Sequence, residues 1–348
     1  MLRTRVTAEY GFDVPIVLAP MGFIATPPLV AAVSGAGGLG LIGASPAPPA
    51  AFAEMIRVTR SLTPAPFGAG FLVVDTAMGP STVDEHIAIV TEERLPVVVF
   101  HWELPPRAWV DELHRGGTRV WLQAGSVERA REAVALGADA VICQGAEAGG
   151  HNRSTTSLLA LLPAMVDAIR PTPVIAAGGI ADGRTLAAAL LLGAGAASLG
   201  TRFIASPEAN AHTEYKRRIA AAGPGATVFT HLFGPEWPDA RIRVLRNRVV
   251  DEWRGRDEKT PPQPEPASCI GTTRLGGAEY RMPKFSALLP TPETSGDFDE
   301  MCLPAGESAA LTSAVTPAAE IVRALADEAE SLLRTVATGR SATPSNPD

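Results

Sequence analysis

Short apolar runs alternate with longer amphipathic stretches from residue 14 to about residue 220. Short apolar runs bounded by glycine, proline or polar residues are typical of buried strands, and the longer periodic stretches are typical of helices. The expected strands are Ile16–Ala19, Leu39–Ile42, Phe67–Val73, Val97–Phe100, Arg119–Leu122, Ala140–Cys143, Val174–Ala177 and Ala197–Leu199. The expected helices lie near residues 27–35, 49–60, 82–93, 106–115, 126–136, 157–169, 182–192 and 208–221.

Eight strands that are each followed by a helix predict an α/β fold, the closed parallel (β/α)8 TIM barrel. An open doubly wound sheet shares this alternation, but its phosphate-binding glycines belong in the first turn between strand and helix. Here the first such turn is Pro20-Met21-Gly22, and the diglycine of greatest chemical interest comes late in the chain. The pattern therefore favours the barrel.

The later part of the chain has a different pattern. Prolines cluster at positions 261, 262, 264 and 266, so residues 223 to about 300 are expected to form an irregular excursion over the barrel mouth. An amphipathic helix follows at residues 317–336. The predicted division is a cofactor-binding barrel at 1–222, a lid and terminal helix at 223–336, and a disordered polar tail at 337–348.

Four apolar residues of the excursion are expected to form a dry wall over the barrel mouth. They are Phe229, Leu232, Phe233 and Trp237.

Composition narrows the classes of function. The 348 residues are 46% hydrophobic and 19% charged, which fits a packed protein, and a net charge of -7 without a basic cluster excludes nucleic acid as the main partner. The apolar runs are too short to span a bilayer, so no membrane partner is expected. Cys143, Cys269 and Cys302 are widely spaced and odd in number, which excludes a disulfide framework and a metal knuckle and favours the cytoplasm.

A glycine-rich loop ending in histidine follows the sixth expected strand. Gln144 to His151 reads QGAEAGGH, so the imidazole of His151 is expected near the tip of this strand. The two glycines before it have no side chains, which allows a flat ligand to lie close to the backbone. Histidine suits proton transfer near neutral pH, which makes His151 a candidate catalytic base. By itself, such a motif is more often a tight turn beside a hydrogen-bonded histidine.

Two further loops predict a phosphate site. Gly178-Gly179 ends the seventh expected strand, and Gly200-Thr201 ends the eighth. In barrel enzymes these two loops often bind phosphate through backbone N–H groups and a helix N-terminus. One such site without a dinucleotide fingerprint indicates a mononucleotide ligand, and no histidine, cysteine or carboxylate cluster has metal-binding spacing.

Taken together, these motifs carry a family resemblance. From residue 10 to residue 335 the chain resembles the nitronate monooxygenases, formerly 2-nitropropane dioxygenases, which are FMN-dependent TIM-barrel proteins. The matching segments are Ala19–Gly22, Gly37–Gly40, Gly145–His151, Gly178–Ile180, Gly200–Phe203, Arg246-Asn247 and Leu303–Glu307.

The resemblance implies roles for individual residues. His151 matches the catalytic histidine of the family. The positions implied to bind FMN are Pro20, Met21, Gly22 and Gly149 at the isoalloxazine ring, Gln123 and Gln144 as polar contacts, and Gly178, Gly179, Gly200 and Thr201 at the phosphate.

Two departures from the family pattern concern the same site. Gly70 stands at the third strand tip and is also implied to be a cofactor-binding position, although many members carry there an asparagine that contacts the flavin. Asn152-Arg153 follow the histidine. Asn152 is therefore a candidate substrate residue. His101, at the fourth strand tip, and His231, in the excursion, are further candidates; the alternative for His101 is a hydrogen bond within its own loop.

The resemblance implies an FMN-dependent oxidoreductase that oxidises nitronates or nitroalkanes with O₂. The alternative is a flavin reductase that takes hydride from NAD(P)H and reduces a quinone or an enoyl thioester. A non-catalytic barrel that binds a phosphate ligand is a third possibility. The expected partners are a small nitro compound and O₂, with NAD(P)H under the alternative, and a homo-oligomer is compatible with the sequence.

Overall fold

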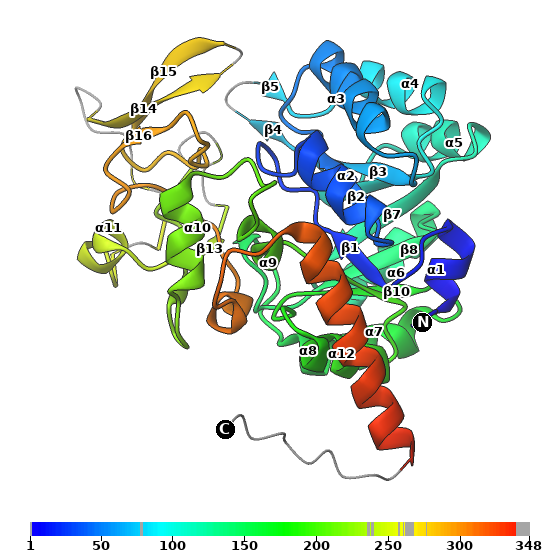
Figure 1. Cartoon of the computed structure of the whole chain (residues 1–348). Helices are drawn as coiled ribbons and strands as arrows, with labels where there is room; N and C mark the ends of the chain where they lie inside the picture. Colours follow the sequence, from blue (N-terminus) through cyan, green and yellow to red (C-terminus); the bar gives the residue numbers. More distant parts are fainter. Residues whose placement is uncertain are drawn as a thin grey trace.

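The barrel predicted from the sequence is confirmed. A computed structural model describes residues 2–76, 79–234, 237, 240–256, 258–259, 261, 268–275 and 277–338. Eight parallel strands form one sheet in the order β1-β11-β10-β8-β7-β6-β3-β2. A parallel bridge between Val17 and Leu39 joins the two edge strands and closes the sheet into a barrel (Figure 1).

The strands and most of the helices lie within two residues of their expected bounds. The strands are β1 (Ile16–Leu18), β2 (Gly40–Gly43), β3 (Phe67–Val73), β6 (Val97–Trp102), β7 (Arg119–Ala124), β8 (Ala140–Gln144), β10 (Val174–Ala177) and β11 (Ala196–Leu199). The helices of the outer layer include α2 (Pro27–Gly35), α3 (Pro49–Leu62), α4 (Asp84–Glu92), α5 (Arg107–Arg115), α6 (Val127–Leu136), α7 (Leu158–Ile169) and α8 (Gly183–Leu191).

The inside of the barrel is a packed core. Val17, Val99 and Ile175 belong to a buried cluster that also includes residues of α1 (Arg5–Tyr10). The ring of Tyr10 meets Trp121 edge to face at 4.9 Å. Helix α1 was not predicted, and it seals the end of the barrel at which the strands begin, so a ligand site is left to the opposite end.

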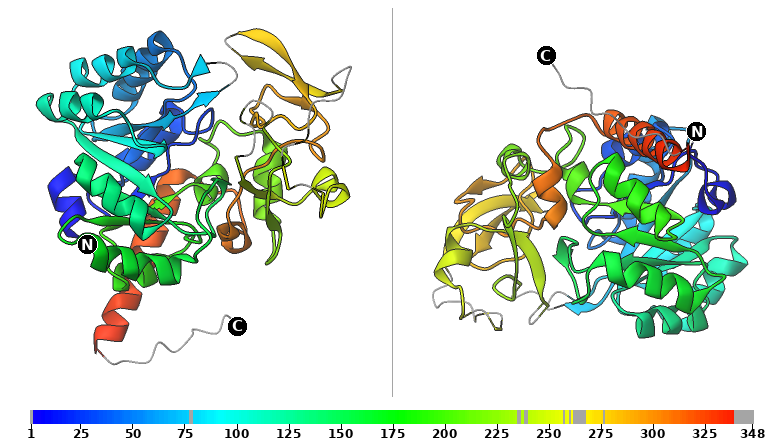
Figure 2. Two further views of the ribbon diagram at one scale, coloured as in Figure 1. Left: turned by 180° about the vertical axis from the view of Figure 1, so that it is seen from behind. Right: turned by 90° about the horizontal axis from the view of Figure 1, so that it is seen from below.

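The last helix of the outer layer differs from the expectation. Residues 208–221 were expected to cover the barrel after the eighth strand, but α10 (Thr213–Ala220) packs against α9 (Thr201–Ile204) and the short helix η1 (Glu307–Leu311). Helix α12 (Ala318–Thr338) packs on α8 and α2 instead (Figures 1 and 2). The Glu328 carboxylate accepts a hydrogen bond from Gly183 N at 2.7 Å, where α8 begins.

The excursion contains two small antiparallel sheets. One has the order β12 (Thr227–Thr230), β13 (Ile242–Leu245) and β9 (Gly150–His151); the other has the order β15 (Ala278–Pro283), β14 (Cys269–Leu275) and β16 (Ser295–Gly296). Figure 1 shows them beside the barrel, with α11 (Arg248–Glu252). The excursion is therefore more regular than predicted; its prolines at 262, 264 and 266 lie outside the described residues, as do residues 339–348 of the expected tail.

The lid has its own core, which corrects one expectation. Leu232 and Phe233 were expected to wall the barrel mouth, but they are fully buried with Ile242, Val244 and Phe285 inside the lid. A short hairpin of β4 (Asp75–Thr76) and β5 (Gly79–Pro80) completes the elements that the structure describes. No helix among the described residues is long and apolar enough to cross a membrane.

Candidate functional site

A lid strand holds His151 at the barrel mouth. His151 lies in β9, which pairs with β13 so that His151 faces Ile242 in register. The Nδ1 atom of His151 is 3.1 Å from the carbonyl oxygen of Ala240. Because a carbonyl only accepts, Nδ1 carries the proton of the neutral imidazole, and Nε2 carries the lone pair.

The surroundings keep this imidazole neutral. The ring centroid of Trp237 is 4.0 Å from that of His151, and Trp102 is 6.0 Å away. Burial lowers the pKa of His151 from 6.5 to about 4, although hydrogen bonds to the carbonyls of Ala240 and Arg241 oppose the shift. At neutral pH, the imidazole of His151 is therefore uncharged, with its lone pair on Nε2.

A chain of hydrogen bonds crosses the mouth along three neighbouring strand tips. Gln144 Nε2 lies 3.3 Å from the carbonyl oxygen of His151, Gln123 Nε2 lies 2.7 Å from Gln144 Oε1, and His101 Nδ1 lies 2.5 Å from Gln123 Oε1. The sequence placed all four residues at strand tips, and the structure brings them into one network. The alternative of a hydrogen bond from His101 within its own loop is not what the structure has.

The backbone carbonyl at one end fixes the direction of the whole chain. His151 O can only accept, so Gln144 donates its amide hydrogen and accepts at Oε1. Gln123 must then donate to Gln144 and accept from His101 Nδ1, which leaves the lone pair of His101 on Nε2. That atom is buried and has no hydrogen-bond partner among the described residues.

Gly70 makes room for His101 and Pro20. A Cβ at residue 70 would collide with the Pro20 ring, and it would lie 3.2 Å from His101 Nε2. Burial lowers the pKa of His101 to about 4, with the hydrogen bond to Gln123 opposing the shift, so the imidazole is neutral at neutral pH. Pro20, Gly70 and His101 thus meet at one place in the mouth.

The two loops expected to hold phosphate have features that would suit an anion. Gly178 and Gly179 have φ angles of 114° and 71°, which only glycine adopts without strain. Helix α9 begins directly after Gly200, and the Thr201 hydroxyl oxygen accepts a hydrogen bond from Gly306 N at 2.9 Å. The hydroxyl hydrogen of Thr201 is therefore left to donate to an anion.

The remaining residues expected at the flavin ring lie close together. A Cβ at Gly200 would be 3.3 Å from Met21 Sδ, and one at Gly22 would be 2.5 Å from Ser45 O. The first turn therefore packs tightly beside the phosphate loops. An orphaned buried acceptor on one side and a glycine cradle on the other fit a flavin mononucleotide across this end of the barrel.

Gly149 has a neighbour that the sequence did not predict. A Cβ there would collide with Gly306 N and lie 2.5 Å from the carbonyl carbon of Ala305, and a Cβ at Gly306 would lie 2.8 Å from Gly149 N. Glu307 N also donates to Glu147 O at 2.9 Å. Two backbone segments thus cross at Gly149 and Gly306. The expected contact of Gly149 with the flavin stays a prediction.

The other two candidate substrate residues have different surroundings. Asn152 is 1% exposed; its Nδ2 donates to Gly145 O at 2.8 Å, and its Oδ1 accepts from Ser154 N at 2.8 Å. These bonds organise the loop, so a direct contact of Asn152 with substrate has no support in this geometry. His231 follows β12, whose last residue Thr230 shares a row with Ile242 and His151, and its contact with substrate stays a prediction.

Arginine and aromatic side chains surround the entrance. The Arg153 guanidinium lies 3.9 Å from the ring centroid of Trp102, whose φ of 77° is unusual for a bulky residue. Phe229 contacts the guanidinium groups of Arg241 and Arg243. Of the four apolar residues expected as a wall, Trp237 is the one that packs on His151.

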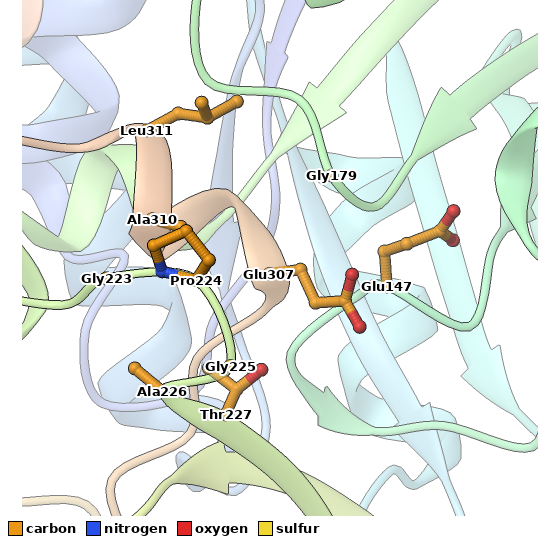
Figure 3. A pocket seen from close by; sticks show the side chains of 10 residues that line it. All are labelled: Glu147, Gly179, Gly223, Pro224, Gly225, Ala226, Thr227, Glu307, Ala310 and Leu311. Carbon is orange, nitrogen blue, oxygen red and sulfur yellow. The ribbon is translucent and has the colours of Figure 1, made fainter.

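A cavity of about 450 Å³ lies between the barrel and the lid. Its walls include Glu147 and Gly179 from the barrel, and Pro224, Glu307 and Leu311 from the lid (Figure 3). Both oxygens of Glu147 accept from Leu158 N, and Glu307 pairs with Arg243 at 3.3 Å. Glu147 is therefore a backbone anchor for α7, and no group of three or more metal-ligating side chains occurs among the described residues.

The fold is that of a TIM-barrel enzyme, and comparison with known proteins identifies the family of oxidoreductases to which the chain belongs. The family model of nitronate monooxygenase matches residues 3–328. The chain belongs to the nitronate monooxygenase family and is an oxidoreductase of that family.

The relatives differ in what their names say they do. A nitronate monooxygenase of Paraburkholderia phytofirmans is 32% identical over 361 residues, covering 91% of this chain and 93% of the relative. A (3aS,4S,5R,7aS)-5-hydroxy-7a-methyl-1-oxo-octahydro-1H-indene-4-carboxyl-CoA dehydrogenase of Mycobacterium tuberculosis is 36% identical over 254 residues, covering 72% and 68%. The structure of FabK from Thermotoga maritima matches with a TM-score of 0.79 at 30% identity, covering 97% of this chain and all of that one.

Proposed function

We propose that this protein is an FMN-dependent oxidoreductase that oxidises nitronates or nitroalkanes with O₂. The observation that carries the proposal is the state of His151 at the barrel mouth. Its imidazole is neutral, its proton is on Nδ1 and its lone pair on Nε2, and its ring lies against Trp237. Membership of the nitronate monooxygenase family supports the same activity.

The residues present suit FMN. Gly178, Gly179, Gly200 and Thr201 would hold its phosphate, while Pro20, Met21, Gly22, Gln123 and Gln144 would surround the ring. When bound, FMN supplies an electron acceptor that O₂ reoxidises.

His151 would handle the proton of a neutral nitroalkane. Its Nε2 takes the α-hydrogen as a proton, the C–H electron pair moves into the nitro group, and the nitronate forms. Trp102 and Trp237 exclude water from this exchange. A nitronate formed in solution has already lost the proton and does not need this step.

The second candidate is a flavin reductase that takes hydride from NAD(P)H and passes it to a quinone or an enoyl thioester. The specific observation in its favour is the 36% identity with a dehydrogenase that acts on a CoA thioester. A shared fold does not decide between the two reactions, because barrel enzymes change chemistry through their loops.

A visible spectrum and anaerobic reduction test the proposal. The purified protein should show the absorption of bound oxidised flavin, and a nitroalkane or nitronate should bleach it without O₂ in a stopped-flow cell. Rapid bleaching by NAD(P)H with none by nitro compounds would favour the reductase. Absence of flavin after reconstitution would contradict both candidates. A cytoplasmic location and a homo-oligomeric state stay predictions.

A further inference from the structure

The Nε2 atom of His101 has no hydrogen-bond partner among the residues that the structure describes, so it can accept a hydrogen bond from a ligand. It is buried, and no partner for it lies in the part of the chain that the structure describes; the hydrogen-bond chain through Gln123 and Gln144 makes it an acceptor. Burial keeps the ring neutral, with a pKa of about 4. A buried acceptor without a donor is costly, by about 1–3 kcal/mol, so a ligand that donates there gains affinity.

The substrate proposed above cannot supply that donor. A nitroalkane and a nitronate carry oxygens that accept hydrogen bonds and no N–H or O–H group, and O₂ has no hydrogen. The oxidised isoalloxazine ring has one N–H group, at N3. The ribityl hydroxyls of FMN are the other donors that this ligand offers.

The order of the strands separates these two sources. In the closed barrel β6 stands opposite β11, and β3 stands opposite β10. The phosphate cradle lies at the tips of β10 and β11, whereas His101 and Gly70 lie on β6 and β3. The part of FMN that reaches His101 is therefore remote from the phosphate, which favours the ring over the ribityl chain.

We propose that His101 Nε2 accepts a hydrogen bond from N3–H of the bound flavin, beside Pro20 and Gly70. The inference rests on the proposed FMN site. It gives His101 the task of a cofactor-binding residue, in place of the substrate contact expected from the sequence. It also explains the glycine at position 70, because a side chain there would begin 3.2 Å from the imidazole nitrogen and collide with Pro20.

Reconstitution of the apoprotein with FMN and with 3-methyl-FMN tests the proposal. The methyl group removes the N3 donor, so the wild-type protein should bind 3-methyl-FMN about 10- to 100-fold more weakly, as measured by quenching of flavin fluorescence. In His101→Leu the preference for FMN should shrink to less than about 3-fold. His101→Gln, which keeps an acceptor oxygen, should retain part of it.

A matched control comes from the opposite end of the barrel. His114 is an exposed residue of α5 whose Nε2 pairs with Asp139, just before β8, so His114→Leu should keep the wild-type preference. If His101→Leu does not fold, the ¹⁵N chemical shift of N3 in labelled FMN bound to the wild-type protein gives the same information. A shift like that of flavin in an aprotic solvent would overturn the proposal.

The outcomes distinguish this proposal from the one on which it rests. A protein that binds neither flavin lacks the proposed cofactor, and both fail. Tight binding of FMN and 3-methyl-FMN with equal affinity would leave the FMN site intact and overturn the role of His101. A full preference that survives in His101→Leu would place the N3 partner elsewhere and overturn it as well.

Discussion

His151 on the barrel loop and Ala240 in the lid are joined by a hydrogen bond of 3.1 Å, from Nδ1 to the carbonyl oxygen, although 89 residues separate them in sequence. The lid therefore determines which nitrogen of the candidate base holds the proton. The neighbouring pair of Ile242 and His151 in the β13–β9 ladder fixes the backbone of the same residue. Both the protonated nitrogen and the backbone position of His151 thus depend on contacts with the lid.

Charge at the phosphate cradle should decide whether FMN stays bound. Gly179→Asp places a carboxylate beside the expected phosphate, and Gly179→Asn is its neutral match in size and tolerates the φ of 71° about as well. We expect Gly179→Asp to lose bound flavin and Gly179→Asn to retain much more, as measured by the ratio of flavin to protein absorbance. Equal flavin occupancy in the two variants would contradict the prediction that this loop binds the phosphate.

The crossing of Gly149 and Gly306 should tolerate no side chain. Gly149→Ala brings a Cβ onto the backbone of residues 305–306 and should disturb the bond from Gly306 N to Thr201, weakening flavin binding. Gly150→Ala is the adjacent control: it strains a φ of 77° by roughly 1–2 kcal/mol but meets nothing within 4 Å. We expect the larger loss of thermal stability and of flavin affinity from Gly149→Ala. A larger loss from Gly150→Ala would show that strain, not the crossing, requires glycine here.

The two depressed histidine pKa values predict a loss of stability in mild acid. His101 and His151 titrate near pH 4 when folded and near 6.5 when unfolded, so between these values the unfolded chain binds more protons. The free energy of unfolding should therefore fall as the pH drops from about 6.5 to about 4. Replacing either histidine by glutamine should flatten this dependence in urea melts at pH 7, 6 and 5. Profiles parallel to the wild type would mean that the two pKa values are not depressed.

Local patterns were enough to predict the barrel strands and the tips that carry Gln123, Gln144 and His151. They were not enough for contacts between distant segments. The pairing of β9 with β13, the crossing of Gly149 with Gly306, and the packing of α12 in the outer layer where residues 208–221 were expected all depend on tertiary packing, which periodicity does not encode.

The lid residues show the same limit. Leu232 and Phe233 were expected as a pocket wall because they are apolar, yet their partners in the lid core bury them completely. Their apolar character alone did not show whether they would line the pocket or pack inside the lid. Asn152 stood out as a departure from the family pattern, but its hydrogen bonds within the loop became visible only in three dimensions.

The most direct test of the account compares two forms of one substrate with His151→Asn. At pH 7, turnover of the neutral nitroalkane should fall by about 10²- to 10⁴-fold, the usual contribution of a positioned base, because Nε2 no longer takes the α-proton. Oxidation of the preformed nitronate should fall far less, FMN should stay bound, and His114→Asn should match the wild type in all three measurements. An equal loss with both substrate forms, or no loss with either, would contradict the assignment of His151 as the proton acceptor.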